Sequence, residues 1–263
     1  MRVVLLTVVL PWCLFGELNR PQQAPRNGGA ADTAQLDSLY FAARPDQALT
    51  VCERTIAAGE DGLELRWRAA RAAIAMGMSI PESPRRKELY DDALTHARRG
   101  LELAPQSNEA RYWVAAAAGR RAHRDDPLLS VRLAYEVFEQ VTPILATDSL
   151  HAGAHHALGE LHAEVMRAPR FVRFVAGRVL RMDLAQRANA IDAERHLRRA
   201  VELDAQVMMF LVDLADFYGR ASRRAELDSV LARMTDAPLR HPMDRTIRDA
   251  RLARWQPAAQ SRR

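Results

Sequence analysis

Beyond residue 32, small and apolar side chains recur with the spacing of an α-helix, and no segment alternates with the period of a β-strand. Five trios of such residues stand at offsets i, i+4 and i+7, which places each trio on one stripe of a helix. The trios are Ala48, Cys52 and Thr55; Ala93, Ala97 and Gly100; Ala134, Phe138 and Val141; Ala193, Leu197 and Ala200; and Ala225, Ser229 and Ala232. Because small side chains let a neighbouring helix approach closely, we expect five closely packed helices.

A second apolar helix is predicted before each of the last four of these stripes. These partner helices cover residues 63–77, 109–123, 151–166 and 207–219. Ser83-Pro84 and Asp126-Pro127 place a capping residue before proline at a helix start. Pro105 and Pro238 mark helix ends, and Pro143 marks an end or a kink. A single hairpin cannot bury its apolar face, so neighbours must stack. The predicted fold is all-α, an α-solenoid of about five helical hairpins.

The first 32 residues differ from the rest. Arg2 precedes an apolar run of 14 residues that ends at Gly16, the pattern of a secretory signal. A straight membrane-spanning helix needs about 20 residues, so the run is short for a span. We expect residues 1–16 to be a signal peptide, cleaved after Gly16 or Ala31, or an uncleaved anchor. Residues 17–32 are expected to be a linker, and the protein to be exported, either periplasmic or secreted.

The amino-acid composition excludes several classes of protein but indicates no particular function. The chain has 263 residues, of which 48% are hydrophobic and 27% charged, so wholesale disorder is excluded. Its net charge is +5, and Lys87 is the single lysine beside 37 arginines, a bias typical of a GC-rich coding sequence. Cys13 and Cys52 are the only cysteines. Two cysteines provide neither a disulfide framework nor a zinc site with four cysteine ligands.

The repeats resemble a known family. The pattern of Ala93, Ala97 and Gly100 followed by Pro105 matches the second helix of the tetratricopeptide repeat. Over residues 36–235 the chain is more similar to the regulator of microtubule dynamics family. The segments that carry this resemblance are 65–71, 87–103, 108–113, 155–159 and the insertion before 191–200. The resemblance implies a right-handed tetratricopeptide-like superhelix, a scaffold role and microtubule association. We interpret the chain as a divergent, bacterial, exported member.

The best candidates for chemistry are histidines. The cluster contains His151, His155, His156 and His162, with Glu160 and Glu164 nearby. His151 and His155 stand at i and i+4, a spacing that can chelate a metal, but one straight helix supplies only two such ligands. A metal-dependent enzyme is therefore only an alternative hypothesis. Nucleophile and phosphate-binding motifs are missing from the sequence. We predict no catalytic residue, no metal and no cofactor.

Two surfaces are candidates for binding a partner. The first is a concave groove on the inner helices, lined by Arg66, Trp67, Arg111, Trp113 and His155. It would hold a protein or peptide, with arginine pairing to acidic groups, so Arg111→Glu is expected to weaken capture.

The second surface is the basic, aromatic insertion 168–190, which offers Arg170, Phe171, Arg173, Phe174, Arg178 and Arg181. Three roles for this insertion stay open: docking to an anionic membrane surface, docking to an acidic partner, and packing against the solenoid itself. The repeat domain is expected to cover residues 33–240. Residues 241–263 follow as a capping helix and a basic tail, for which nucleic-acid binding is disfavoured. The leading interpretation is a non-catalytic scaffold or adaptor.

Overall fold

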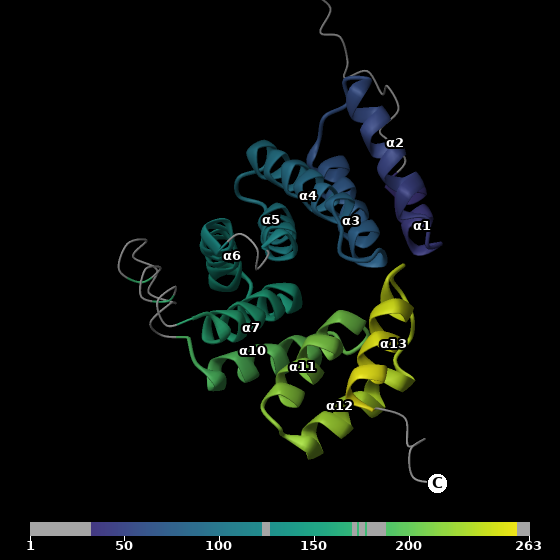
Figure 1. The fold of residues 1–263 in the computed structure, drawn as a ribbon. Helices are drawn as coiled ribbons and strands as arrows, with labels where there is room; N and C mark the ends of the chain where they lie inside the picture. The colour runs from purple at the N-terminus through teal and green to yellow at the C-terminus, as the bar shows by residue number, and fades with distance from the viewer. Residues whose placement is uncertain (1–32, 123–126, 170–172, 174–176, 178–187, 257–263) are drawn as a thin grey trace, which may run out of the picture. The chain divides into compact units, whose positions relative to one another are not determined.

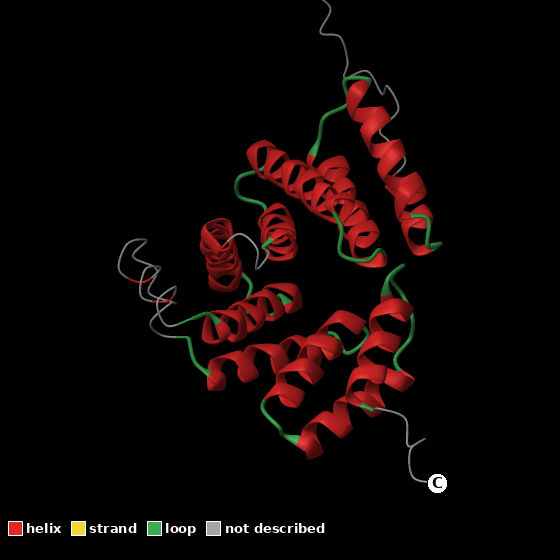
Figure 2. Ribbon diagram, in the orientation of Figure 1, coloured by secondary structure: helices red, strands yellow, loops and turns green. Residues whose placement is uncertain are grey.

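A computed structural model describes residues 33–122, 127–169, 173, 177 and 188–256. Every regular element within these ranges is an α-helix (Figure 2). In chain order they are α1 (Thr33–Phe41), α2 (Pro45–Ala57), α3 (Leu63–Ser79), α4 (Pro84–Leu103), α5 (Asn108–Arg121), α6 (Pro127–Thr147), α7 (Ala152–Arg167), α10 (Ala190–Leu203), α11 (Met208–Arg220), α12 (Arg224–Asp236) and α13 (Asp244–Trp255). None of these helices combines the length and the apolar character that crossing a membrane requires.

The helices form five hairpins and one additional helix. The hairpins pair α1 with α2, α3 with α4, α5 with α6, α7 with α10, and α11 with α12, while α13 packs mainly against α11 (Figure 1). The first helices of successive hairpins also contact one another: α1 with α3, α3 with α5, α5 with α7, and α7 with α11. This arrangement confirms the predicted α-solenoid.

The predicted small-residue stripes explain most of the helix packing. Ala93, Ala97 and Gly100 of α4 are buried against α3, and Cys52 of α2 is fully buried. Burial in this apolar surrounding raises the pKa of the Cys52 thiol to about 11.

The fifth stripe was predicted wrongly. Ala225, Ser229 and Ala232 of α12 are exposed. The buried side chains of this helix are instead Leu227, Val230, Leu231 and Met234. Ala225 and Leu227 are two positions apart, which corresponds to a rotation of about 200° around the helix. The predicted small-residue stripe therefore lies on the solvent side of α12. In this helix large apolar residues, rather than small ones, form the core stripe.

Helix α7 and helix α10 approach each other closely at Gly159. A methyl group added at this glycine would lie 2.8 Å from the backbone nitrogen of Leu197. Backbone atoms cannot swing aside as a flexible side chain can, so only glycine permits this distance between the helices.

The helix boundaries follow the local sequence. The hydroxyl of Ser83 accepts a hydrogen bond from the backbone nitrogen of Arg86 at 3.3 Å, with Pro84 in the first helical position. Pro105 and Pro238 follow the ends of α4 and α12, whereas Pro143 lies inside α6. Asp126, the other predicted cap, is outside the described residues.

The first hairpin meets the segment that precedes α13. The hydroxyl of Tyr40 forms a hydrogen bond of 3.1 Å with Nδ1 of His241, and the two rings pack edge to face. At the far end of α13, Nε1 of Trp255 donates to Oδ1 of Asp216 at 2.8 Å. α13 is thereby fixed to α11 by a hydrogen bond and connected to the first hairpin by a contact that spans 201 positions of sequence.

Candidate ligand-binding cavity

The first helices of the hairpins, together with α6 and α13, surround a cavity of about 790 Å³. This volume lies within the range of protein sites for small ligands, about 300 to 1,000 Å³. Most of the wall is apolar, and methionine and aromatic side chains are prominent in it. The apolar lining includes Ile74, Met78, Trp113, Val131, Ala134, Val137, Leu161, Met209, Phe210 and Ile247. A small set of charged residues interrupts this lining.

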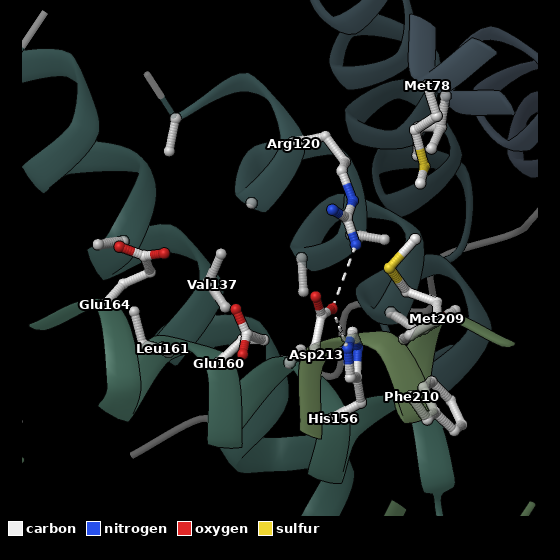
Figure 3. Close-up of a pocket in the computed structure, with 18 of the residues that line it drawn as sticks. Met78, Arg120, Val137, His156, Glu160, Leu161, Glu164, Met209, Phe210 and Asp213 are labelled. Atoms are coloured by element: carbon white, nitrogen blue, oxygen red, sulfur yellow. Dashed lines mark hydrogen bonds and ion pairs between the residues drawn. The ribbon is translucent and has the colours of Figure 1, made fainter. Parts of the chain in front are cut away.

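The central charged group is a buried pair from α7 and α11. Nε2 of His156 donates to Oδ2 of Asp213 at 2.8 Å, and both side chains are only 10% exposed (Figure 3). Nη2 of Arg120, from α5, lies 3.9 Å from the same oxygen. Burial alone would raise the pKa of Asp213, but the hydrogen bond from His156 and the charges of Arg120 and Arg251 hold it below its usual value. Asp213 is therefore a carboxylate whose charge is balanced by protein groups.

Glu160 lies one helical turn after His156 and has a different environment. Among the described residues its carboxyl group makes no hydrogen bond, and the nearest cation, Nη2 of Arg167, is 3.9 Å away. Arg167 is also in direct contact with Glu164. Burial, followed by the negative charge of Asp213, raises the pKa of Glu160 to about 8. The side chain keeps 28% of its exposure because it faces the cavity. Glu160 is thus a protonated acid at neutral pH.

The opposite part of the wall combines aromatic rings with one arginine. Arg71 of α3 is bonded to Asp37, and its guanidinium carbon lies 4.0 Å from the centre of the Tyr40 ring. Trp113 of α5 also faces the cavity and stacks on Trp67, with 5.8 Å between the ring centres. Such stacking stabilises both the cation and the rings.

Only part of the predicted groove lies on this wall. Trp113 lines the cavity, whereas Trp67 stacks on Trp113 and is not part of the lining. Arg66 instead pairs with Asp61 at 2.6 Å, and Arg111 donates to Gln140 of α6.

His155 likewise turns away from the cavity, since its Nδ1 lies 2.8 Å from Nδ1 of His196 on α10. Successive residues differ by about 100° around a helix. Neighbours in sequence such as His155 and His156 therefore face different elements, and Arg66, Arg111 and His155 are not among the residues that line this cavity.

The predicted histidine cluster is dispersed by the same geometry. His151 caps α7, because its Nδ1 accepts a hydrogen bond from the backbone nitrogen of Ala154 at 3.1 Å. His162 is buried and stacks on His196. Within the described part of the chain, no group of three or more His, Cys, Asp or Glu side chains is arranged to hold a metal ion.

The insertion is described at only a few positions. Arg173 lines the cavity next to Pro169. The other predicted docking residues, Arg170, Phe171, Phe174, Arg178 and Arg181, lie outside the described residues, as do the signal-like run and the linker in residues 1–32.

Sequence reasoning missed several charged residues of the wall: Arg71, Arg120 and Asp213. One sequence pattern indicates these positions: a charged residue that shares a helical face with apolar residues on the first helix of a hairpin. Arg71, Ile74 and Met78 have offsets i, i+3 and i+7, and so do Trp113, Ala116 and Arg120. A similar spacing, i, i+4 and i+8, places His156, Glu160 and Glu164 on one face of α7.

Stacked helical hairpins around a lined inner cavity define a protein of the tetratricopeptide-repeat class. The family model described as regulator of microtubule dynamics protein 1-3 matches residues 32–254. The chain therefore belongs to the regulator of microtubule dynamics family, as its repeats had predicted. Curated protein sequences include none that matches it significantly.

The chain is also similar to several solved structures. A tetratricopeptide-repeat protein of Thermus thermophilus, TTC0263, is similar with a TM-score of 0.56 and 18% identity, over 84% of this chain and 94% of that one. MamA from Desulfovibrio magneticus has a TM-score of 0.41 and 16% identity, over 78% of this chain and 93% of its own. A human IFIT1 dimer, solved with PPP-AAAA, has a TM-score of 0.45 and 13% identity, covering 82% and 52%. The likeness to TTC0263 concerns the fold alone.

Proposed function

We propose that this chain is a non-catalytic helical-repeat scaffold that binds a segment of a partner protein in the cavity between its first helices. The observation that carries the proposal is the cavity itself, because its wall is mostly apolar and its charged groups stand at a few fixed positions. Preformed walls of this kind reduce the conformational entropy lost on binding. Arg120 lies near Asp213 and His156 donates a hydrogen bond to it, so this carboxylate already has partners within the protein, which suits a binding wall.

Gly119 offers a direct test of this proposal. This residue lines the cavity, and a Cβ atom placed on it would meet no atom within 4 Å. A tryptophan at position 119 would therefore project into the cavity without displacing the core. Ala225 is exposed on α12, away from the cavity, so Ala225→Trp is the matched control.

The experiment captures the tagged full-length chain from its own cells and identifies the retained proteins by mass spectrometry. We expect a partner in stoichiometric amount with the wild-type chain and with Ala225→Trp, and its loss with Gly119→Trp. Arg111→Glu is now expected to leave capture unchanged, since Arg111 faces α6. Undiminished capture by a folded Gly119→Trp protein, shown by circular dichroism, would refute the cavity as the binding site.

We further propose that the protein is exported and that residues 1–16 direct this export. The support is the basic residue Arg2 followed by the 14-residue apolar run. Cell fractionation with N-terminal sequencing of the mature chain tests it, and a cytoplasmic chain that keeps residues 1–16 would contradict it.

A further inference from the structure

We propose that Glu160 receives the ammonium or guanidinium group of a lysine or arginine side chain from the segment bound in the cavity. The inference rests on the proposed function and adds the chemistry of the bound group. The Glu160 carboxyl faces the cavity and makes no hydrogen bond with any described residue. A partly buried carboxyl group without such bonds is costly unless a ligand supplies a donor.

The charges around Glu160 show which donor fits. After burial, the four influences that act most strongly on this carboxyl are the charges of Asp213, Arg167, Glu164 and Arg120. These are two acids and two bases, so they balance one another. Arg173 also lines the cavity. An ionised Glu160 therefore has one cation nearby, Arg167 at 3.9 Å, which it shares with Glu164, and a cation from a ligand gives it a partner of its own.

The neighbouring elements leave this role to a ligand. Arg167 is in contact with Glu164, and Arg120 lies 3.9 Å from Asp213. Arg251 of α13 pairs with Asp216 at 3.0 Å, and His156 donates to Asp213. In the view of Figure 3, Glu160 lies between Glu164 and Asp213, with its carboxyl group beside the open space of the cavity.

When no ligand is bound, a proton on the Glu160 carboxyl neutralises its charge. Burial and Asp213 raise the pKa of Glu160 to about 8, so the carboxyl is mostly protonated at pH 7. When a cationic side chain enters, the ionised form becomes favourable and the proton passes to the solvent buffer. Binding should therefore release close to one proton per bound segment at pH 7, and affinity should rise toward pH 8.5, where lysine is still charged.

The apolar lining of the cavity can pack against the aliphatic part of a lysine or arginine side chain. Leu161, Val137 and Met209 line the cavity near the charged group (Figure 3). Lysine and arginine carry long aliphatic stems that pack on apolar surface while the charged end reaches a polar group. The apolar lining and the acid thus match one amphipathic side chain.

The test uses two capped tripeptides as probes, acetyl-Leu-Lys-Leu-amide and its norleucine counterpart, which lacks only the ammonium group. Isothermal titration calorimetry with the full chain at pH 7, in phosphate and in Tris, gives both affinity and proton release. We expect the lysine peptide to bind at least about tenfold more tightly than the norleucine peptide and to release a proton. Glu160→Gln should keep norleucine binding, lose the preference for lysine and release no proton. Glu102→Gln, an exposed glutamate on α4, is the control and should behave as wild type.

The outcomes separate the two proposals. Equal binding of both peptides that Gly119→Trp abolishes would overturn the role of Glu160 and leave the cavity as the binding site. A lysine preference that survives Glu160→Gln would also overturn it. If neither peptide binds, while vesicles of phosphatidylglycerol do, both the cation inference and the peptide-binding cavity are wrong.

Discussion

At the scale of single residues, two of the glycines in the inner helices, Gly159 and Gly119, have opposite roles. Gly159 allows α7 and α10 to touch, whereas Gly119 faces open space. Glycine costs helix stability relative to alanine unless its missing side chain is needed. The sequence alone does not distinguish the two positions, because both stand inside predicted helices.

The corresponding alanine variants should therefore change stability in opposite directions. Gly119→Ala is expected to raise the free energy of unfolding by about 0.5 to 1 kcal/mol through helix propensity. Gly159→Ala is expected to lower it by about 1 to 3 kcal/mol, because the new methyl group meets the backbone of Leu197. Urea unfolding followed by circular dichroism measures both. A stabilised Gly159→Ala protein would show that the helices can separate at little cost.

Of the residues proposed for the partner groove, Trp113 lines the cavity. His156 and Glu160, noted in the sequence at i and i+4, line it too. Which stripe faces the cavity depends on the rotation of each helix against its neighbours, and an error of one residue changes the direction by about 100°. For this reason Arg111 contacts Gln140 of α6 and His155 contacts His196 of α10, and neither lines the cavity.

At the scale of helices, the α7–α10 hairpin contains three histidines that make it sensitive to acid. His155 and His196 are 2.8 Å apart at their Nδ1 atoms, and His162 stacks on His196. Burial, followed by the charges of His155 and Arg195, lowers the pKa of His196 from 6.5 to about 4. Burial also lowers the pKa of His162.

These shifts predict a loss of stability in mild acid. The folded-state pKa of His196 lies below its unfolded-state value, so the unfolded chain takes up a proton first as the pH falls. The stabilising effect is complete above about pH 6.5 and is lost as the pH falls toward 4. Melting temperatures between pH 7.5 and 4 should decline, and His196→Gln should make the decline shallower. An identical decline in this variant would assign acid sensitivity to other groups.

The hairpins could be predicted from the sequence because small side chains on one helix face let the neighbouring helix approach closely. Four of the five small-residue trios lie at packed positions, and proline positions agree with the ends of α4 and α12. The fifth trio failed because α12 packs through Leu227, Val230, Leu231 and Met234 instead. Offsets of small residues identify a close helix contact, and they lose this meaning where the contact is made by large side chains.

At the scale of the whole repeat domain, one contact departs from the nearest-neighbour logic of a solenoid. Repeat proteins are stabilised mainly by interactions between adjacent repeats. The hydrogen bond between Tyr40 and His241 instead links the first hairpin to the segment before α13. Residues from both of these segments line the cavity.

Removing this hydrogen bond should loosen two distant segments together. In Tyr40→Phe, we expect hydrogen exchange to accelerate by up to about tenfold both in α1 and in residues 238–247, because the contact is worth about 0.5 to 1.5 kcal/mol. Hydrogen–deuterium exchange with mass spectrometry measures this change. Tyr135→Phe on the exposed face of α6 is the control. Acceleration confined to α1 would show that the ends open independently.

The burial of Cys52 has a practical consequence for studying this protein. Its thiol is fully covered and has a pKa of about 11, so it is almost entirely in the unreactive thiol form at neutral pH. In a Cys13→Ser background, a cysteine introduced at position 119 would be the only reactive sulfur. A fluorescent or spin label attached at position 119 would lie at the cavity wall, and its signal would report whether a ligand occupies the cavity.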